Sequence, residues 1–165
     1  MFQLKSISPD AVPAAQKKAV RYRLLNEPRL AESICKDILA VDPDNQNATI
    51  TLVLSITDQF GAGGRRMNEG LALLAQVEDE FQREYYRGLV LERRAMAQLN
   101  VTTPASGNVA YDWFRQAMQH FERAEEISPP GNDDALLRWN TCARLINDNE
   151  HIRPAPDERV ELMLE

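Results

Sequence analysis

A glycine-rich segment followed by arginine, Gly61-Ala62-Gly63-Gly64-Arg65-Arg66, is the first stretch whose residue types could bind phosphate. Backbone N–H groups of glycine-rich loops and arginine side chains both contact anions. The spacing matches neither the phosphate-loop pattern nor the dinucleotide-binding pattern, and no β-strand is expected before it. The sequence therefore predicts a turn between helices, and unspecific anion contact by Arg65 or Arg66 stays open.

Side chains that bear oxygen gather in Asp42-Pro43-Asp44-Asn45-Gln46-Asn47. A calcium loop requires glycine at its sixth position, which is Asn47 here, and a bidentate Glu at its twelfth, which is Val53. A helix stop and a helix cap explain these residues better. The two histidines, His120 and His151, lie in no metal-binding spacing. We therefore expect no bound metal and no cofactor.

The two cysteines, Cys35 and Cys142, fall far apart at apolar positions of predicted helices. Buried free thiols in a reducing compartment are the expected arrangement, and a disulfide is the alternative. Residues 1–7 lack the apolar core of a signal peptide. The apolar tract near Ile50 to Ile56 is far shorter than the ~20 residues of a membrane span. These features favour a cytoplasmic protein.

The composition limits the class of partner. Among 165 residues, 44% are hydrophobic and the net charge is −6. This hydrophobic content is sufficient for a core, so the chain is expected to fold. The negative charge argues against nucleic acid and against anionic membranes, because both are bound by basic surfaces. No local signature of a nucleophile with its base is found, and we expect a non-enzymatic protein.

Apolar residues at helical spacing predict seven helices and no strand. Asn26 and Asn45 are placed to cap the second and third helices. A loop is expected from Asn100 to Val109. The predicted helices are Asp10–Leu25, a second from Pro28 to the stop at Asp42, Gln46–Phe60, Arg66–Asp79, Phe81–Leu99, a sixth that ends before Pro129, and a seventh that starts near Asp133.

One pattern occurs in two of these helices. In the sixth helix Ala117, Phe121, Ala124 and Pro129 follow one another at intervals of four, three and five residues. The second helix has the same intervals, and its four residues are Ala31, Cys35, Ile38 and Pro43. Small residues at such positions let two helices approach closely, and the proline ends the run.

This pattern resembles the tetratricopeptide repeat, a helix–turn–helix unit of about 34 residues. The resemblance covers most of Ala15 to Leu145, with a degenerate middle unit. It implies an all-α, right-handed solenoid of about three helix pairs and a C-terminal capping helix over residues 1–149, followed by a tail over 150–165. Pro43 and Pro129 lie 86 residues apart. Insertions at 61–64 and 100–108 are expected to account for the excess over two repeats.

The resemblance also implies a binding face on the concave side, formed by the first helix of each pair. Its mixture of apolar residues, tyrosine and arginine suits an extended or helical peptide, and an ordinary solvated face is the alternative. The positions transferred in register are Gln16, Val20, Arg23, Asn47, Ile50, Leu54, Asp58, Tyr85, Leu89, Glu92, Arg93, Asn140 and Arg144.

These features predict a scaffold or adaptor that binds a peptide or helix of a partner protein. A structural or regulatory subunit, a self-associating protein and a protein similar to secretion chaperones are the alternatives. Val160, Met163 and Leu164 in the tail are expected to form a short helix that docks on the seventh helix, or to join two chains in a homodimer.

Overall fold

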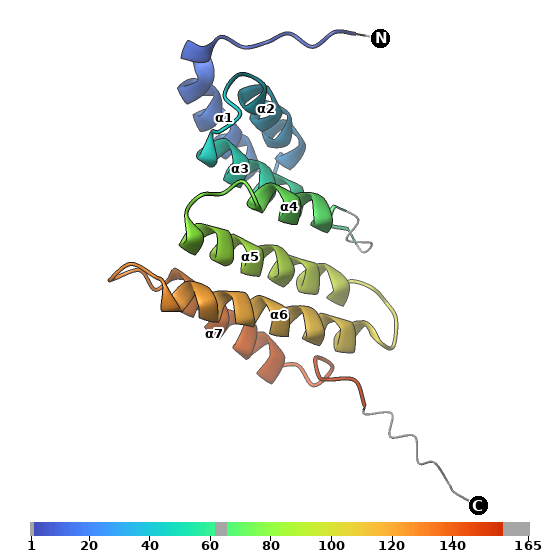
Figure 1. Cartoon of the computed structure of the whole chain (residues 1–165). Coiled ribbons are helices and arrows are strands. Elements are labelled where there is room, and N and C mark those ends of the chain that lie inside the picture. Colours follow the sequence, from blue (N-terminus) through green and yellow to red (C-terminus); the bar gives the residue numbers. More distant parts are fainter. Residues whose placement is uncertain (1, 62–65, 157–165) are drawn as a thin grey trace, which may run out of the picture.

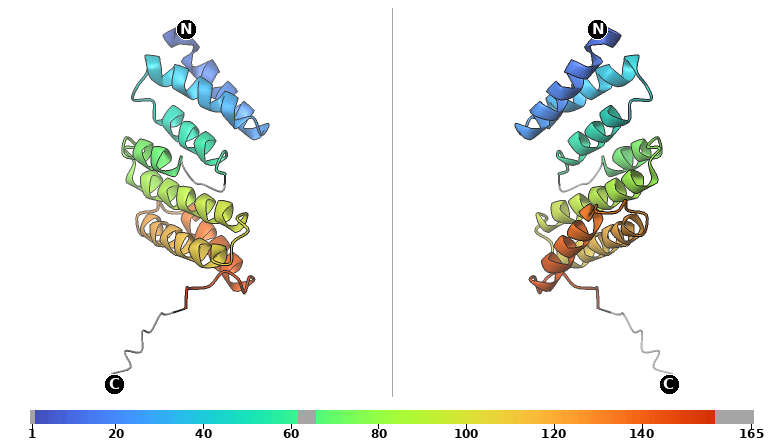
Figure 2. Two further views of the ribbon diagram at one scale, coloured as in Figure 1. Left: turned by 90° about the vertical axis from the view of Figure 1, so that its right-hand side faces the viewer. Right: turned by 90° about the vertical axis from the view of Figure 1, so that its left-hand side faces the viewer.

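The computed structural model describes residues 2–61 and 66–156, which form helices and connections without any strand. The prediction of an all-α fold is confirmed for this part of the chain. The helices stack in chain order as an elongated column (Figures 1 and 2). Its elements are the 3-10 helix η1 (Pro9–Ala11) and the α-helices α1 (Val12–Leu24), α2 (Pro28–Val41), α3 (Gln46–Thr57), α4 (Met67–Leu74), α5 (Glu80–Leu99), α6 (Ser106–Glu126) and α7 (Asp134–Asn147).

Each helix packs on the next one along the chain, and the odd-numbered helices also meet one another. Helix α1 contacts α3, α3 contacts α5, and α5 contacts α7. The odd-numbered helices therefore share one side of the column. None of the described helices is both long and apolar enough to cross a bilayer.

Asn26 ends the first helix, although the sequence predicted that it would cap the second. Its φ is +60°, and its backbone N–H donates to the carbonyl of Arg23. Asparagine tolerates this left-handed conformation better than most residues, so it closes a helix as glycine often does. The N-cap of α2 is Glu27, which makes no side-chain capping bond.

The prediction for Asn45 is confirmed, because its side chain accepts a hydrogen bond from the N–H of Ala48 at 2.9 Å. The predicted helix 66–79 is too long, since α4 ends at Leu74. Asp79 begins a new helix, and its carboxylate accepts from the N–H of Gln82 at 2.7 Å. A capping acid favours a helix start at the residue that follows it.

The loop between α5 and α6 is shorter than predicted. Helix α6 begins at Ser106, within the expected loop from Asn100 to Val109. Helices α5 and α6 have 20 and 21 residues, whereas α1 to α4 have between 8 and 14. The last helix pair is thus lengthened mainly by longer helices.

The residues predicted for helix packing are buried. Ala31, Ala117, Phe121 and Ala124 have no exposed surface. Phe121 lies in the largest core cluster, which α5, α6 and α7 build together. Cys142 belongs to the same cluster, and both cysteines are buried free thiols as predicted. Burial raises the pKa of each thiol to about 12, so neither is reactive near neutral pH.

The segment that follows α7 packs on the start of α6. Ile152 is 3% exposed and joins the core cluster of α5, α6 and α7. Asn108 donates to the carbonyls of Arg153 and Pro154 at 2.8 and 3.1 Å. A Cβ atom at Gly107 would lie 2.0 Å from the His151 carbonyl oxygen, so only glycine permits this approach. The predicted tail helix with Val160, Met163 and Leu164 lies outside the described residues.

A buried carboxylate of α2 joins the segment that follows α3 and the residue that precedes α4. Glu32 of α2 accepts two hydrogen bonds from Arg66, at 2.7 and 2.8 Å. Lys36 and Gln59 also donate to it, at 2.6 and 2.7 Å. The bonds from Arg66 are the main reason that the pKa of Glu32 falls to about 2, against the opposing effect of burial. Arg66 precedes α4, so this carboxylate fixes the start of that helix.

Lowering the pH should destabilise the folded chain by protonating Glu32. Because the pKa is about 2 in the folded chain and 4.5 ordinarily, the stabilisation is complete above about pH 4.5 and is lost as the pH falls toward 2. Glu32→Gln should lower the free energy of unfolding by about 2 kcal/mol at pH 7 and much less near pH 2.5. Urea unfolding measures both differences. Glu150→Gln, which changes an exposed acid, is the control, and an equal loss at both pH values would contradict the assignment.

Adding one methyl group at Gly88 should destabilise the core. A Cβ atom there would lie 2.6 Å from the ring of Phe121, which is fully buried and cannot move aside. We expect Gly88→Ala to lower the free energy of unfolding by about 1–3 kcal/mol in urea titrations. Gly70→Ala is the matched control, because its nearest side-chain atoms are 4.0 Å away. It should be neutral or stabilise by up to about 1 kcal/mol, since alanine favours helix.

Candidate functional site

A hollow of about 420 Å³ lies on the side formed by the odd-numbered helices. It opens between α1, α3 and the start of α5. Its walls combine apolar side chains with amides, a hydroxyl, a phenol and a guanidinium. The lining residues are Gln16, Val20 and Arg23 of α1, Asn47, Ile50, Thr51 and Leu54 of α3, and Gln82 and Tyr86 of α5.

Equivalent positions of three helices meet in this hollow. Gln16 and Thr51 lie 35 residues apart, and Tyr86 follows after another 35. Asn47 and Gln82 have the same separation. The spacing of α1, α3 and α5 is therefore 35 residues, even across the segment 61–64. The predicted insertion at 61–64 does not lengthen the repeat, and the excess falls in the last helix pair.

The polar groups in the hollow are only partly satisfied. Gln16 donates through Nε2 to the Thr51 hydroxyl at 2.9 Å and to the Asn47 carbonyl at 3.4 Å. Its Oε1 is buried and accepts no hydrogen bond from the described residues. Burial raises the pKa of Tyr86, so its hydroxyl keeps its proton near neutral pH. The hollow thus offers the Tyr86 phenol and the Gln82 amide to a ligand, while the unpaired Oε1 of Gln16 is buried beneath its surface.

An ionic cluster lies at one end of the hollow and joins the three helices. Arg23 Nε lies 2.6 Å from Asp58 Oδ2, and Arg93 Nη1 lies 2.7 Å from Asp58 Oδ1. Arg23, Asp58 and Arg93 follow one another at the same 35-residue interval. Arg93 also donates to the carbonyl of Leu54 at 3.1 Å and to the Thr57 hydroxyl.

A second ion pair continues this connection to α7. Arg138 Nη1 lies 3.2 Å from Glu92 Oε1. Burial raises the pKa of Glu92, and the nearby Arg138 opposes that rise. Glu92 is only 5% exposed, and Arg138, together with the nearby Arg93, compensates its charge. The four odd-numbered helices are therefore linked by ion pairs along one side.

The ion pairs leave an excess of positive charge when both acids are ionised. Three arginines, Arg23, Arg93 and Arg138, stand against the two carboxylates of Asp58 and Glu92. Arg23 and Arg93 share one acid, and their side chains are 23% and 24% exposed. A ligand carboxylate could therefore approach this end of the hollow without a large desolvation of the arginines.

The structure brings together part of the predicted binding face. Gln16, Arg23 and Asn47 line the hollow with the apolar Val20, Ile50 and Leu54, and Asp58 and Arg93 lie at its end. Glu92 and Leu89 are buried. Asn140 and Arg144 lie on α7, outside the hollow.

Tyr85 lies on the side of α5 that faces the core, although it was predicted to lie on the binding face. Its ring stacks on Phe81 with centroids 5.8 Å apart and tilts against Phe121 at 6.0 Å. Arg138 of α7 also interacts with it. The next residue, Tyr86, lines the hollow instead. Thr51, Gln82 and Tyr86 were not predicted for this face, although each lies one or two 35-residue intervals after Gln16 or Asn47.

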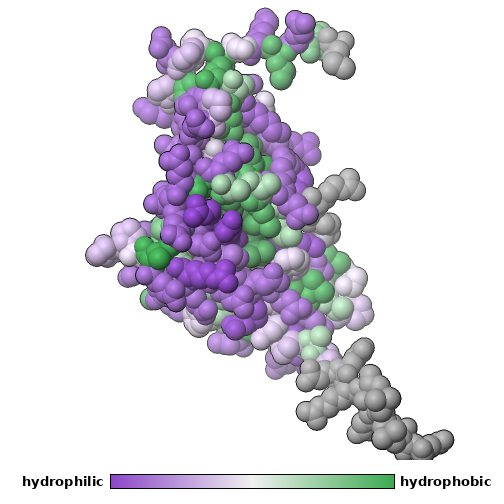
Figure 3. Space-filling view, viewed as in Figure 1, coloured by the Kyte–Doolittle hydropathy of each residue, from purple (hydrophilic) through white to green (hydrophobic). Residues whose placement is uncertain are grey.

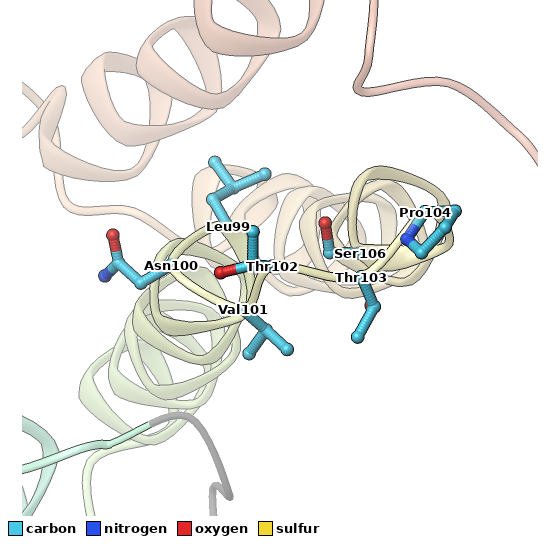
Figure 4. Close-up of a pocket in the computed structure, with 7 residues that line it drawn as sticks. All are labelled: Leu99, Asn100, Val101, Thr102, Thr103, Pro104 and Ser106. Carbon is cyan, nitrogen blue, oxygen red and sulfur yellow. The ribbon is translucent and has the colours of Figure 1, made fainter.

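A larger hollow of about 490 Å³ lies at the connection between α5 and α6. Figure 4 shows that its lining side chains point in different directions, with Leu99 and Val101 on opposite sides of the chain. No set of polar groups converges there, so it is a weaker candidate for binding. Within residues 2–61 and 66–156, no three His, Cys, Asp or Glu side chains are grouped as metal ligands.

No protein-family model, no curated protein and no solved structure matches the chain.

Replacing the shared acid should destabilise the fold in a way that depends on salt. Asp58→Asn leaves Arg23 and Arg93 close together without their counter-charge. Because these groups are partly exposed, we expect a loss of about 1–2 kcal/mol in the free energy of unfolding at low salt and a smaller loss at 1 M salt. Asp112→Asn changes an exposed acid of α6 and is the control. A loss that does not respond to salt would show that packing, not charge, is affected.

Proposed function

We propose that this chain is a helical-repeat protein of the tetratricopeptide type, and that the hollow between α1, α3 and α5 binds a peptide or a helix of a partner protein. The observation that supports this most is the meeting of Gln16, Thr51 and Tyr86 at intervals of 35 residues. A surface that repeats with the helix pairs suits an extended ligand, because successive ligand residues then meet equivalent positions.

The proposed fold is a right-handed solenoid of three helix pairs, α1–α2, α3–α4 and α5–α6, with α7 as its last helix. The mutual contacts of the odd-numbered helices support it, since these helices line the concave side in the family that the sequence resembles. The 35-residue interval is close to the family's 34.

The residues that line the hollow indicate which groups of a ligand it would bind. Val20, Ile50 and Leu54 would contact an apolar side chain, while the Gln82 amide would bind backbone groups. Arg23 would contact an acidic group of the ligand. The lining holds no acid, histidine or cysteine, so the proposal is a binding protein and not an enzyme. The buried free thiols of Cys35 and Cys142 support a reducing, cytoplasmic location.

A second candidate function is a structural subunit or a self-associating protein. It is supported by three exposed leucines at the turn between α1 and α2: Leu24, Leu25 and Leu30 are 77%, 60% and 47% exposed. Apolar side chains exposed on the first helix pair suit an interface with another protein.

A charged side chain in the hollow should weaken peptide binding. Val20 is 42% exposed and lines the hollow, so Val20→Arg fills it without a change in the core. Peptides selected from a displayed random library on the unchanged protein should bind Val20→Arg at least about tenfold more weakly, a loss of about 1.4 kcal/mol or more. Fluorescence anisotropy with the selected peptides measures both affinities.

Leu137→Arg is the matched control, because Leu137 is 60% exposed on α7 and lies outside the hollow. This variant should bind the selected peptides as the unchanged protein does. Equal affinity of all three proteins would contradict binding in the hollow, and the structural-subunit function would then be favoured.

A further inference from the structure

An extended arm precedes the first helix and carries two apolar side chains into solvent. Residues 2–8 form no regular secondary structure, and Phe2 and Leu4 are 101% and 93% exposed. The arm runs away from the helices (Figure 1) and stands clear of the body in the space-filling view (Figure 3). Full exposure of an aromatic and a leucine is unfavourable in water, so burial of both would drive an association.

A separate hollow of about 310 Å³ lies at the base of this arm, between η1, α1 and α2. Five of its lining residues are apolar, and Lys18 and Asp37 complete its lining. The apolar residues are Ile7, Ala11, Ala14, Ala15 and Ile34. Three alanines leave room for a large side chain from outside, because their own side chains are small. This hollow is distinct from the one proposed for peptide binding, and the two share no residue.

We propose that the arm of one chain docks in the α1–α2 hollow of a second copy, so that two chains exchange arms in a symmetric dimer. Phe2 and Leu4 of each arm would enter the partner's hollow. Such an interface is self-complementary, since each chain supplies one arm and one hollow. The proposal is independent of peptide binding between α1, α3 and α5.

Two features favour a second copy over the chain's own hollow. Ile7 lines the hollow and the chain leads away from it, so Phe2 could return only through a tight reversal within residues 3–6. Among these residues, Gln3-Leu4-Lys5-Ser6, only Ser6 is of a type that favours turns, and there is no glycine, proline, Asn or Asp. A second chain can place its extended arm there without any reversal.

Charge also suits this occupant. The arm carries Lys5 and no acid over residues 2–8, while the whole chain has a net charge of −6. Asp37 in the hollow takes part in no ion pair with the described residues. Lys5 of an incoming arm would supply its counter-charge. Lys5 of the arm would therefore have Asp37 to pair with, in a hollow whose other charged residue is Lys18.

Cross-linking between two singly substituted chains tests the exchange. Gln3→Cys places a thiol between Phe2 and Leu4, and Lys18→Cys places one at the hollow, so the apolar contacts are kept. The native cysteines are buried and do not compete. After mild oxidation of an equimolar mixture, we expect a disulfide-linked heterodimer on non-reducing gels, at least about tenfold more than with Leu137→Cys as the partner, because docking raises the local thiol concentration.

Further variants distinguish arm exchange between two chains from an arm that folds back on its own chain. Adding Phe2→Ser and Leu4→Ser to the Gln3→Cys chain should remove the excess heterodimer, since the arm then has nothing to bury. In a single chain with both Gln3→Cys and Lys18→Cys, an internal disulfide in a monomer would show that the arm folds back, and would overturn the exchange. Heterodimer no more abundant than with Leu137→Cys would also overturn it. Light scattering of the unsubstituted chain should show a dimer.

Discussion

The close approach of paired helices at residues without large side chains is the constraint on which this molecule depends. Ala31, Ala117 and Ala124 have no exposed surface, and Gly88 lies against the ring of Phe121. A small residue on one helix gives a large residue on its partner a place to pack, so the pair is held at one distance and one register. Because each pair buries only part of its surface in this way, the remaining apolar surface is buried by the next pair.

The regular register determines the surface as well as the core. When α1, α3 and α5 are separated by 35 residues each, residues that are not buried also fall in rows. One row places Gln16 beside Thr51 and Tyr86, and another aligns Arg23, Asp58 and Arg93. Neither row continues beyond α5. The helices of the last pair are longer than the earlier ones, and α7 packs beside Tyr85 of α5. The hollow is thus confined to the part of the column where the spacing is uniform.

The local chemistry of the sequence predicted much of this fold. Apolar periodicity predicted seven helices, and Asn45 and the buried cysteines were predicted correctly. The predictions for Asn26 and for the end of α4 were wrong. Asparagine and aspartate occur at either end of a helix, and the neighbouring residues determine which end they occupy. Tyr85 and Tyr86 could not be separated by pattern alone, since adjacent residues on a helix differ by about 100° and a register one residue in error exchanges them. The contacts of Glu32 with Arg66 could not be predicted, because they join side chains 34 residues apart through tertiary packing.

The ionic cluster of Arg23, Asp58 and Arg93 determines the register of the helices more than their stability. Ion pairs that are partly exposed, as between Arg23 and Asp58, contribute less to stability than the apolar core does, because water also solvates the separated charges. Their geometry is nevertheless specific, since Asp58 contacts arginines from both neighbouring odd-numbered helices. The apolar core therefore supplies the free energy that holds α1, α3 and α5 together, and the ion pairs select the register in which they meet. A ligand carboxylate that competes with Asp58 for Arg23 would then disturb the cluster at little cost to the fold, because the core contacts of Ala19 and Ile56 stay unchanged.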